Sequence, residues 1–183
     1  MDKPTHKDRL VTAAALLFRR KGFHGVGVAE ILAAANAPKG SLYHHFPNGK
    51  SDLALAAAEW ASVGMLGIID ASFDGKPTVQ DALTTLCFKL AKFFDLSEQW
   101  DGCPVSNILF EGPDNDAFRL CADSIFEAWC NRMVAHGTAM GMSDADMWKL
   151  AERFLLLLQG SWVMARARRN ADIIRHLPEH LFT

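Results

Sequence analysis

Apolar residues recur every three or four positions along almost all of this 183-residue chain, and alternating strand patterns are missing. The chain is therefore predicted to be all-α, with about nine helices. Gly22, which can adopt the left-handed conformation of a helix C-cap, is expected to end the first of them. The expected helix ranges are 5–21, 28–35, 39–45, 50–70, 78–96, 104–112, 114–136, 143–169 and 171–181.

Charge is distributed unevenly between the two ends of the chain. Residues 1–50 hold eight basic and three acidic side chains, whereas residues 51–183 hold eleven basic and eighteen acidic ones. A basic head on an acidic body suits an anionic polymer that binds at one end only. The alternative, that a small domain carries such a charge by chance, stays open on this evidence alone.

The first three predicted helices match the three-helix form of a helix-turn-helix. A longer helix is followed by two short ones, and a tight turn at 36–38 joins these two. Leu42 and Phe46 lie four residues apart and are expected to anchor the third helix to the helices beneath it. The polar side chains of 39–45 would then form its outer face. A helix of this size fits a major groove about 12 Å wide. A surface turn in any α-protein is the plainer alternative.

The motif Lys39-Gly40-Ser41-Leu42-Tyr43-His44-His45-Phe46-Pro47, together with Asp8-Arg9-Leu10, Leu17-Phe18 and Lys21-Gly22-Phe23 before it, resembles the N-terminal domain of the TetR family of transcriptional repressors. The resemblance covers about 50 residues. It implies a helix-turn-helix DNA-binding domain at 1–49 and an effector-binding and dimerisation domain at 50–183. It also implies a homodimer that a small molecule releases from a palindromic operator of double-stranded DNA.

On this resemblance, the third helix supplies most of the expected DNA contacts. Lys39 and Ser41 would reach base edges or phosphates, and Gly40 would let the backbone approach. Tyr43 is expected to hydrogen-bond a phosphate, and His44 either a phosphate or a base edge.

Thr5 and Lys50 are expected to hold the flanking phosphates from the starts of the first and fourth helices. Two departures from the family pattern stand out. Gly27 occupies a position where the family usually has Ser or Thr, and the segment 46–50 is one residue longer than usual. The longer form, with Gly102-Cys103-Pro104, resembles the subgroup of drug-efflux and lincomycin-resistance regulators.

The body is expected to bind a small, largely apolar effector, since such pockets are mostly apolar with a few polar groups that fix orientation. Aromatic residues at helical spacing are more often core residues, so that alternative stays open for each of them. The candidate pocket residues are Trp60, Phe93, Asn107, Phe110, Phe126, Trp129, Gln159 and Trp162. Glu111 and His136 are further polar candidates.

The helix predicted at 143–169 is apolar on nearly every face, with Leu156, Leu157 and Val163 lying off its main stripe. Such a helix must be buried on more than one side. We therefore expect a homodimer that forms through about 143–181 and resembles a four-helix interface.

The four cysteines, Cys87, Cys103, Cys121 and Cys130, form no CxxC pair, so the sequence predicts no zinc ribbon and no disulfide framework. A thiol-based redox switch that uses Cys103 or its neighbours is the alternative function. No catalytic motif, metal site or cofactor motif is found, and an enzyme is not expected. The N-terminus does not resemble a signal peptide and no span is long enough for a membrane, so a cytoplasmic protein is expected.

Overall fold

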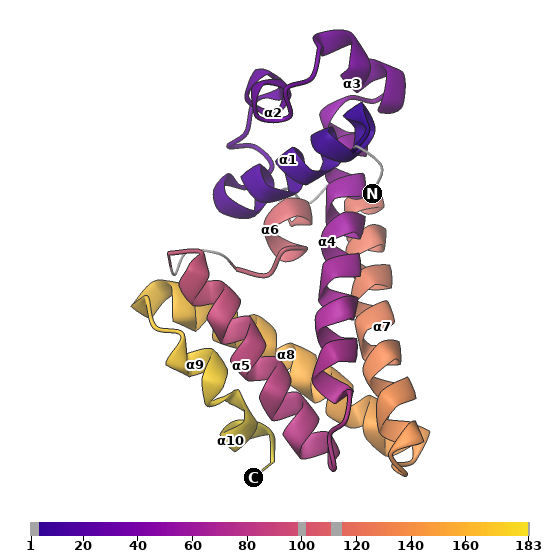
Figure 1. Ribbon diagram of the computed structural model, residues 1–183, viewed down its shortest axis with the longest axis vertical. Coiled ribbons are helices and arrows are strands. Elements are labelled where there is room, and N and C mark those ends of the chain that lie inside the picture. The colour runs from indigo at the N-terminus through magenta and orange to yellow at the C-terminus, as the bar shows by residue number, and fades with distance from the viewer. Residues whose placement is uncertain (1–3, 99–101, 111–114, 183) are drawn as a thin grey trace. The chain divides into compact units, whose positions relative to one another are not determined.

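The computed structural model describes residues 4–98, 102–110 and 115–182. Within these ranges the chain forms ten helices and no strand, so the all-α prediction is confirmed (Figure 1). The helices are α1 (His6–Lys21), α2 (Val28–Ala34), α3 (Lys39–His45), α4 (Lys50–Phe73), α5 (Val79–Leu96), α6 (Ser106–Leu109), α7 (Asp116–Ala139), α8 (Asp144–Arg168), α9 (Asp172–Arg175) and α10 (Leu177–Leu181).

The single helix predicted at 171–181 is wrong, because the segment forms two short helices, α9 and α10. Pro178 is the cause. A proline lacks the N–H that would bond the carbonyl four residues back, and its ring clashes with that carbonyl. The chain therefore leaves the helix after Arg175 and begins a new one with Pro178 in its first turn, where no such bond is needed.

Local capping chemistry sets several of the helix starts. The Thr5 hydroxyl accepts a hydrogen bond from the Asp8 N–H at 3.2 Å, and the Asp8 carboxylate accepts one from the Thr5 N–H at 2.9 Å. This reciprocal pair is a capping box. The Ser143 hydroxyl caps α8 by accepting a hydrogen bond from the Asp146 N–H at 3.2 Å. Gly22 ends α1 with a φ of +70°, a backbone conformation that favours glycine.

The chain divides into two compact units, and these do not coincide with the predicted segments 1–49 and 50–183. Unit 1 comprises residues 1–63 and 104–123, and unit 2 comprises residues 64–103 and 124–183. The short helix α6 and the first turns of α7 therefore belong to the same unit as the helix-turn-helix. The helices α4 and α7 each begin in unit 1 and end in unit 2.

Each unit has its own apolar core. In unit 1, α1 packs against α2, α3 and α6, around the buried side chains Leu10, Phe18, Ile31, Leu42, Leu53, Ile108 and Phe118. In unit 2, α9 and α10 pack against α5 and α8, around the buried side chains Leu83, Leu86, Phe94, Trp129, Phe154, Leu158 and Ile174.

By length and hydropathy alone, α4 could cross a membrane. Its side chains Leu53, Ala57 and Ile69 are, however, at most 1% exposed, because they pack inside the protein. An apolar helix whose side chains are buried in this way is typical of a protein core. We therefore assign α4 to the core.

Candidate functional site

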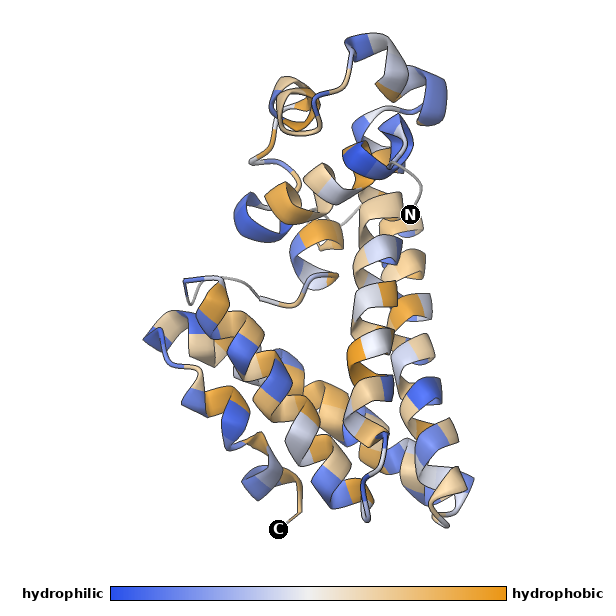
Figure 2. Ribbon diagram, viewed as in Figure 1, coloured by the Kyte–Doolittle hydropathy of each residue, from blue (hydrophilic) through white to orange (hydrophobic). Residues whose placement is uncertain are grey.

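The outer face of α3 is polar and exposed. Leu42 and Phe46 are 1% and 4% exposed and fix the helix against α1 and α2. Lys39, Tyr43 and His44 are exposed. The ribbon of α3 is coloured mostly toward the hydrophilic end of the scale (Figure 2). One apolar seam below a polar face is the arrangement that a recognition helix requires.

The other two predicted DNA contacts on α3, Gly40 and Ser41, differ in how open they are to a ligand. A Cβ at Gly40 would meet no atom within 4 Å, so the backbone here is open to an approaching ligand. Ser41 is half-buried, and its hydroxyl donates a 2.8 Å hydrogen bond to the Pro38 carbonyl. The Ser41 oxygen can still accept a hydrogen bond, but its proton is already used within the chain.

The turn between α2 and α3 is held by a residue that sequence analysis did not assign to the site. Asn36 has a φ of +46°, in the left-handed region that asparagine tolerates better than most residues. The Arg9 guanidinium on α1 donates to the Asn36 carbonyl at 3.3 Å. Arg9 therefore helps to set the angle at which α3 is presented, although no local pattern links residues 27 positions apart.

Lys50, predicted to contact phosphate, has partners within unit 1. Its ammonium donates to the carbonyls of Phe23 and Val26 at 2.9 and 3.1 Å, and it lies 4.2 Å from the centre of the Phe23 ring. An ammonium has three N–H donors, so one remains for a phosphate. Thr5 is exposed, and its side chain is part of the capping box of α1.

The eight predicted pocket residues are divided between the two units. Trp60, Asn107 and Phe110 belong to unit 1, and the other five belong to unit 2. Trp129 and Trp162 are 1% and 5% exposed, as core side chains are. The residues Trp60, Phe93 and Phe110 are roughly half exposed.

Three polar or half-buried members of that set have specific contacts. The Asn107 amide donates to the Arg19 carbonyl at 2.9 Å and so joins α6 to the last turns of α1. The Gln159 amide donates to the Cys103 sulfur at 3.4 Å. Phe126 is half-buried, and its ring centre lies 5.5 Å from that of Trp129. Glu111 lies outside the described residues.

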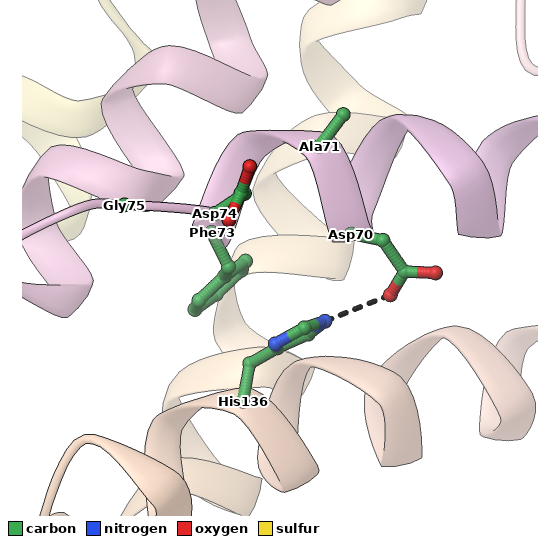
Figure 3. A pocket seen from close by; sticks show the side chains of 6 residues that line it. All are labelled: Asp70, Ala71, Phe73, Asp74, Gly75 and His136. Atoms are coloured by element: carbon green, nitrogen blue, oxygen red, sulfur yellow. Dashed lines mark hydrogen bonds and ion pairs between the residues drawn. The ribbon is translucent and has the colours of Figure 1, made fainter.

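An open cavity of about 520 Å³ in unit 2 is lined by Asp70, Ala71, Phe73, Asp74, Gly75 and His136 (Figure 3). The Asp70 carboxylate accepts hydrogen bonds from His136 at 2.7 Å and from Arg132 at 2.5 Å. These two partners, His136 first, hold the pKa of Asp70 below its usual value. The Phe73 ring stacks on His136, with centroids 4.9 Å apart.

Of the residues that the sequence predicts for an effector pocket, this cavity holds only the further polar candidate His136. Its strongest groups already satisfy one another, and they join the last turns of α4 to α7. Lys89 on α5 adds a 2.7 Å hydrogen bond to the Ala71 carbonyl. We interpret the cluster as an anchor for the C-terminal end of α4.

The thiols are poorly suited to redox chemistry. Burial raises the pKa of Cys87 to about 12 and that of Cys130 to about 11, and it also raises the pKa of Cys121. Cys103 is 4% exposed. Since the thiolate is the reactive species, these findings count against the redox alternative. Among the described residues, no group of three His, Cys, Asp or Glu side chains could hold a metal ion.

Comparisons with known proteins agree with this geometry. Residues 10–57 match the family profile of the bacterial regulatory proteins of the tetR family, and residues 80–180 match that of the LmrA/YxaF-like transcriptional regulator C-terminal domain. The transcriptional regulator YxaF of Bacillus subtilis is 32% identical over 176 residues, which cover 96% of this chain and 92% of YxaF.

Two further proteins are similar over nearly the whole chain. The transcriptional regulator AcuR of Cereibacter sphaeroides is 32% identical, over 95% of this chain and 80% of AcuR. The crystal structure of a regulatory protein TetR from Rhodobacter sphaeroides superposes with a TM-score of 0.81 at 29% identity, over 94% of this chain and 95% of that one.

Proposed function

Because this chain belongs to the TetR family of bacterial transcriptional regulators, with an LmrA/YxaF-like C-terminal domain, we propose that it is a repressor that responds to a ligand. A homodimer would bind a palindromic operator in the cytoplasm and place α3 of each protomer in the major groove. A small, largely apolar effector held by residues 50–183 would release the DNA. The relatives are regulators and not enzymes, and this proposal includes no catalytic step.

The observation that carries the DNA-binding proposal is the outer face of α3. Lys39, Tyr43 and His44 are exposed on one short helix that Leu42 fixes from below. Cationic and hydrogen-bonding side chains on a rigid helix can bind phosphates and base edges. Gly40 and the Ser41 oxygen complete the proposed contact face, and Thr5 and the third N–H of Lys50 are proposed to reach the flanking phosphates.

The dimer proposal is supported by exposed apolar side chains on α8. Leu156, Val163 and Met164 are 70%, 69% and 41% exposed. Large apolar side chains on one exposed face indicate a protein interface. The apolar residues Leu177 and Leu181 of α10 are buried within unit 2, so we propose that α8 supplies most of the interface within 143–181.

The effector site remains a proposal built on the eight aromatic and polar residues named above. Trp60 and Phe110 in unit 1, and separately Phe93 in unit 2, are half-exposed apolar side chains of the kind that a largely apolar ligand requires. The buried Trp129 and Trp162 would support such a pocket from the core and would not line it.

Selection of bound sequences from randomised DNA tests this function directly. The full-length protein should enrich a palindrome whose half-sites are about one helical turn apart, or a small multiple of that. Lys39→Ala should weaken binding to the selected operator. Lys92→Ala, which removes an exposed lysine of α5 in unit 2, is the matched control and should leave binding unchanged. If no sequence were enriched, or if wild-type affinity did not depend on salt, the proposal would be wrong.

A further inference from the structure

The exposed apolar face of α8 has a glycine at its centre. Gly160 lies between Leu156 and Val163, which are 70% and 69% exposed. A Cβ at Gly160 would meet no atom within 4 Å, and Gly160 is not among the glycines with a positive φ. A glycine in a helix interior costs stability relative to alanine. Nothing that packs against Gly160 within the described chain therefore requires a glycine there.

We propose that α8 packs antiparallel on α8 of a second copy of this chain and that the two helices cross at Gly160. The inference rests on the homodimer proposed above and assigns its register. A residue without a side chain lets two backbones approach more closely than any other residue does. The glycine that is a cost in the isolated chain becomes favourable at such a crossing.

The residues around Gly160 are arranged so that the face is complementary to itself. Leu156 and Val163 are seven residues apart, which is about two helical turns, so they lie on the same stripe. A two-fold axis near Gly160 places Leu156 of one protomer against Val163 of its partner, and the same contact forms twice. This reciprocity is what an isologous interface requires.

The charges along α8 favour the antiparallel orientation. Its first half carries Asp144, Asp146 and Glu152, with Lys149 between them and Arg153 directly after them, whereas its last turn and C-cap carry three arginines and no acid: Arg166, Arg168 and Arg169. Antiparallel packing brings the acidic end of one helix toward the basic end of the other. Parallel packing would set arginines against arginines. Glu152 and Arg168 are each eight residues from Gly160, so they lie level along the axis when the helices cross there.

Cysteine crosslinking tests the register. At the crossing, the two copies of Gly160→Cys should lie within the Cα separation of about 7 Å that a disulfide allows. Lys149→Cys is the matched control, because it is exposed on the same face but its two copies would be about 33 Å apart at 1.5 Å per residue. Under a mild oxidant, the Gly160→Cys variant should form a covalent dimer, and Lys149→Cys and the wild type should not.

Each outcome separates the register from the dimer itself. If sedimentation finds a wild-type dimer while Gly160→Cys fails to crosslink, or while Lys149→Cys crosslinks equally well, the register is wrong and the dimer stands. If the wild type sediments as a monomer at micromolar concentration, the proposed homodimer fails, and the register with it.

Gly160→Ala provides a second measurement, because a merely exposed glycine and a glycine at the crossing predict different effects of the added methyl group on the dimer. A merely exposed glycine would yield a more stable helix and an unchanged dimer. A glycine at the crossing would yield a dimer that dissociates at least about tenfold more readily, while circular dichroism finds the helical content of the protomer retained. Equal or tighter association of Gly160→Ala would overturn the proposal.

Discussion

The Lys50 ammonium donates a 2.9 Å hydrogen bond to the carbonyl of Phe23 and lies 4.2 Å from the centre of the Phe23 ring. The first residue of α4 is thereby joined to the segment between α1 and α2. The Phe23 ring in turn packs edge-on against Phe118 of α7, with centroids 5.3 Å apart. Phe23 is therefore a point at which three parts of unit 1 meet.

Lys50→Met should lower the free energy of unfolding by about 1–3 kcal/mol, since two hydrogen bonds to a charged donor are lost. It should flatten the dependence of operator affinity on salt by less than Lys39→Ala does. Removal of a phosphate contact at Lys39 should reduce the log–log slope by about one unit for each protomer. Urea unfolding and fluorescence anisotropy between 50 and 300 mM salt give both quantities. If Lys50→Met left the free energy of unfolding unchanged and reduced the salt slope as much as Lys39→Ala does, Lys50 would act only as a phosphate-binding residue.

Tyr43→Phe should leave stability unchanged, because Tyr43 is 52% exposed and its ring is retained. Operator affinity should fall about tenfold for each protomer if the hydroxyl donates to a phosphate, since each such bond is worth about 1.5 kcal/mol or more. The loss should be similar for specific and non-specific DNA, because phosphate contacts do not read sequence. Anisotropy titrations with both DNAs measure it. Equal affinities of Tyr43→Phe and the wild type would remove Tyr43 from the interface.

Local signals were enough to predict most of the fold. The caps at Thr5 and Ser143 and the left-handed Gly22 are short-range features, and the helix starts and the helix end that they predict are found in the structure. The error at 171–181 also has a local cause, because Pro178 breaks a pattern that is otherwise periodic. The division into units could not be predicted, since α6 joins the helix-turn-helix through the contact of Asn107 with Arg19, 88 residues away.

In the candidate site, too, features that depend on neighbouring residues could be predicted, and contacts between residues far apart in the sequence could not. The polar face of α3 is visible in a run of seven residues. Its support is not, because Arg9 and Asn36 lie 27 residues apart. The anchor of the C-terminal end of α4 in unit 2 is equally hidden, because Asp70 and His136 lie 66 residues apart. Neither pair has a spacing that indicates contact, so only the folded chain reveals them.

Asp70→Asn should destabilise the protein by about 0.5–1 kcal/mol at pH 7, a magnitude typical of exposed ion pairs. The pKa of Asp70 is lowered by its hydrogen bonds to His136 and Arg132. Its stabilising contribution is therefore present above the unfolded-state pKa near 3.8 and is lost as the pH falls through the lower folded-state pKa. The difference between Asp70→Asn and the wild type should thus shrink below about pH 4.

Urea unfolding at pH 7, 5 and 3 gives this comparison. Asp74→Asn, on the same cavity but exposed, is the control and should have little effect at any of the three values. A difference between Asp70→Asn and the wild type that grew on acidification would contradict the assignment of Asp70 as a stabilising carboxylate.

Peroxide should leave operator affinity unchanged within about twofold. The thiol pKa values of Cys87 and Cys130 are about 12 and 11, so the reactive thiolate is scarce at neutral pH. Anisotropy before and after treatment, with mass spectrometry of the cysteines, measures the effect. Rapid oxidation of Cys103 with loss of DNA binding, abolished in Cys103→Ser, would restore the redox alternative.

Effector binding and operator binding should oppose each other through α4. This helix runs without a break from Lys50, which is fastened to Phe23, to Asp70, which is fastened to Arg132 and His136. A rigid element held at both ends can transmit a small shift as a change in the DNA-binding head. Coupling of about 1–3 kcal/mol would change operator affinity roughly 5- to 150-fold, and the operator must weaken effector binding by the same factor.

A panel of apolar and cationic aromatic compounds, screened by quenching of the five tryptophans, should yield a compound that releases the operator. Its dissociation constant should be measured with and without operator present, because the two couplings must agree. Asp70→Asn, which loosens one attachment of α4, should reduce the coupling while the compound still binds. A compound that binds residues 50–183 and leaves operator affinity unchanged would indicate that α4 only packs in the core and does not couple the two sites. A coupling factor that falls in Asp70→Asn, while the compound keeps its affinity for the DNA-free protein, would place the coupling in this helix, because a loss of compound binding alone would leave the factor unchanged.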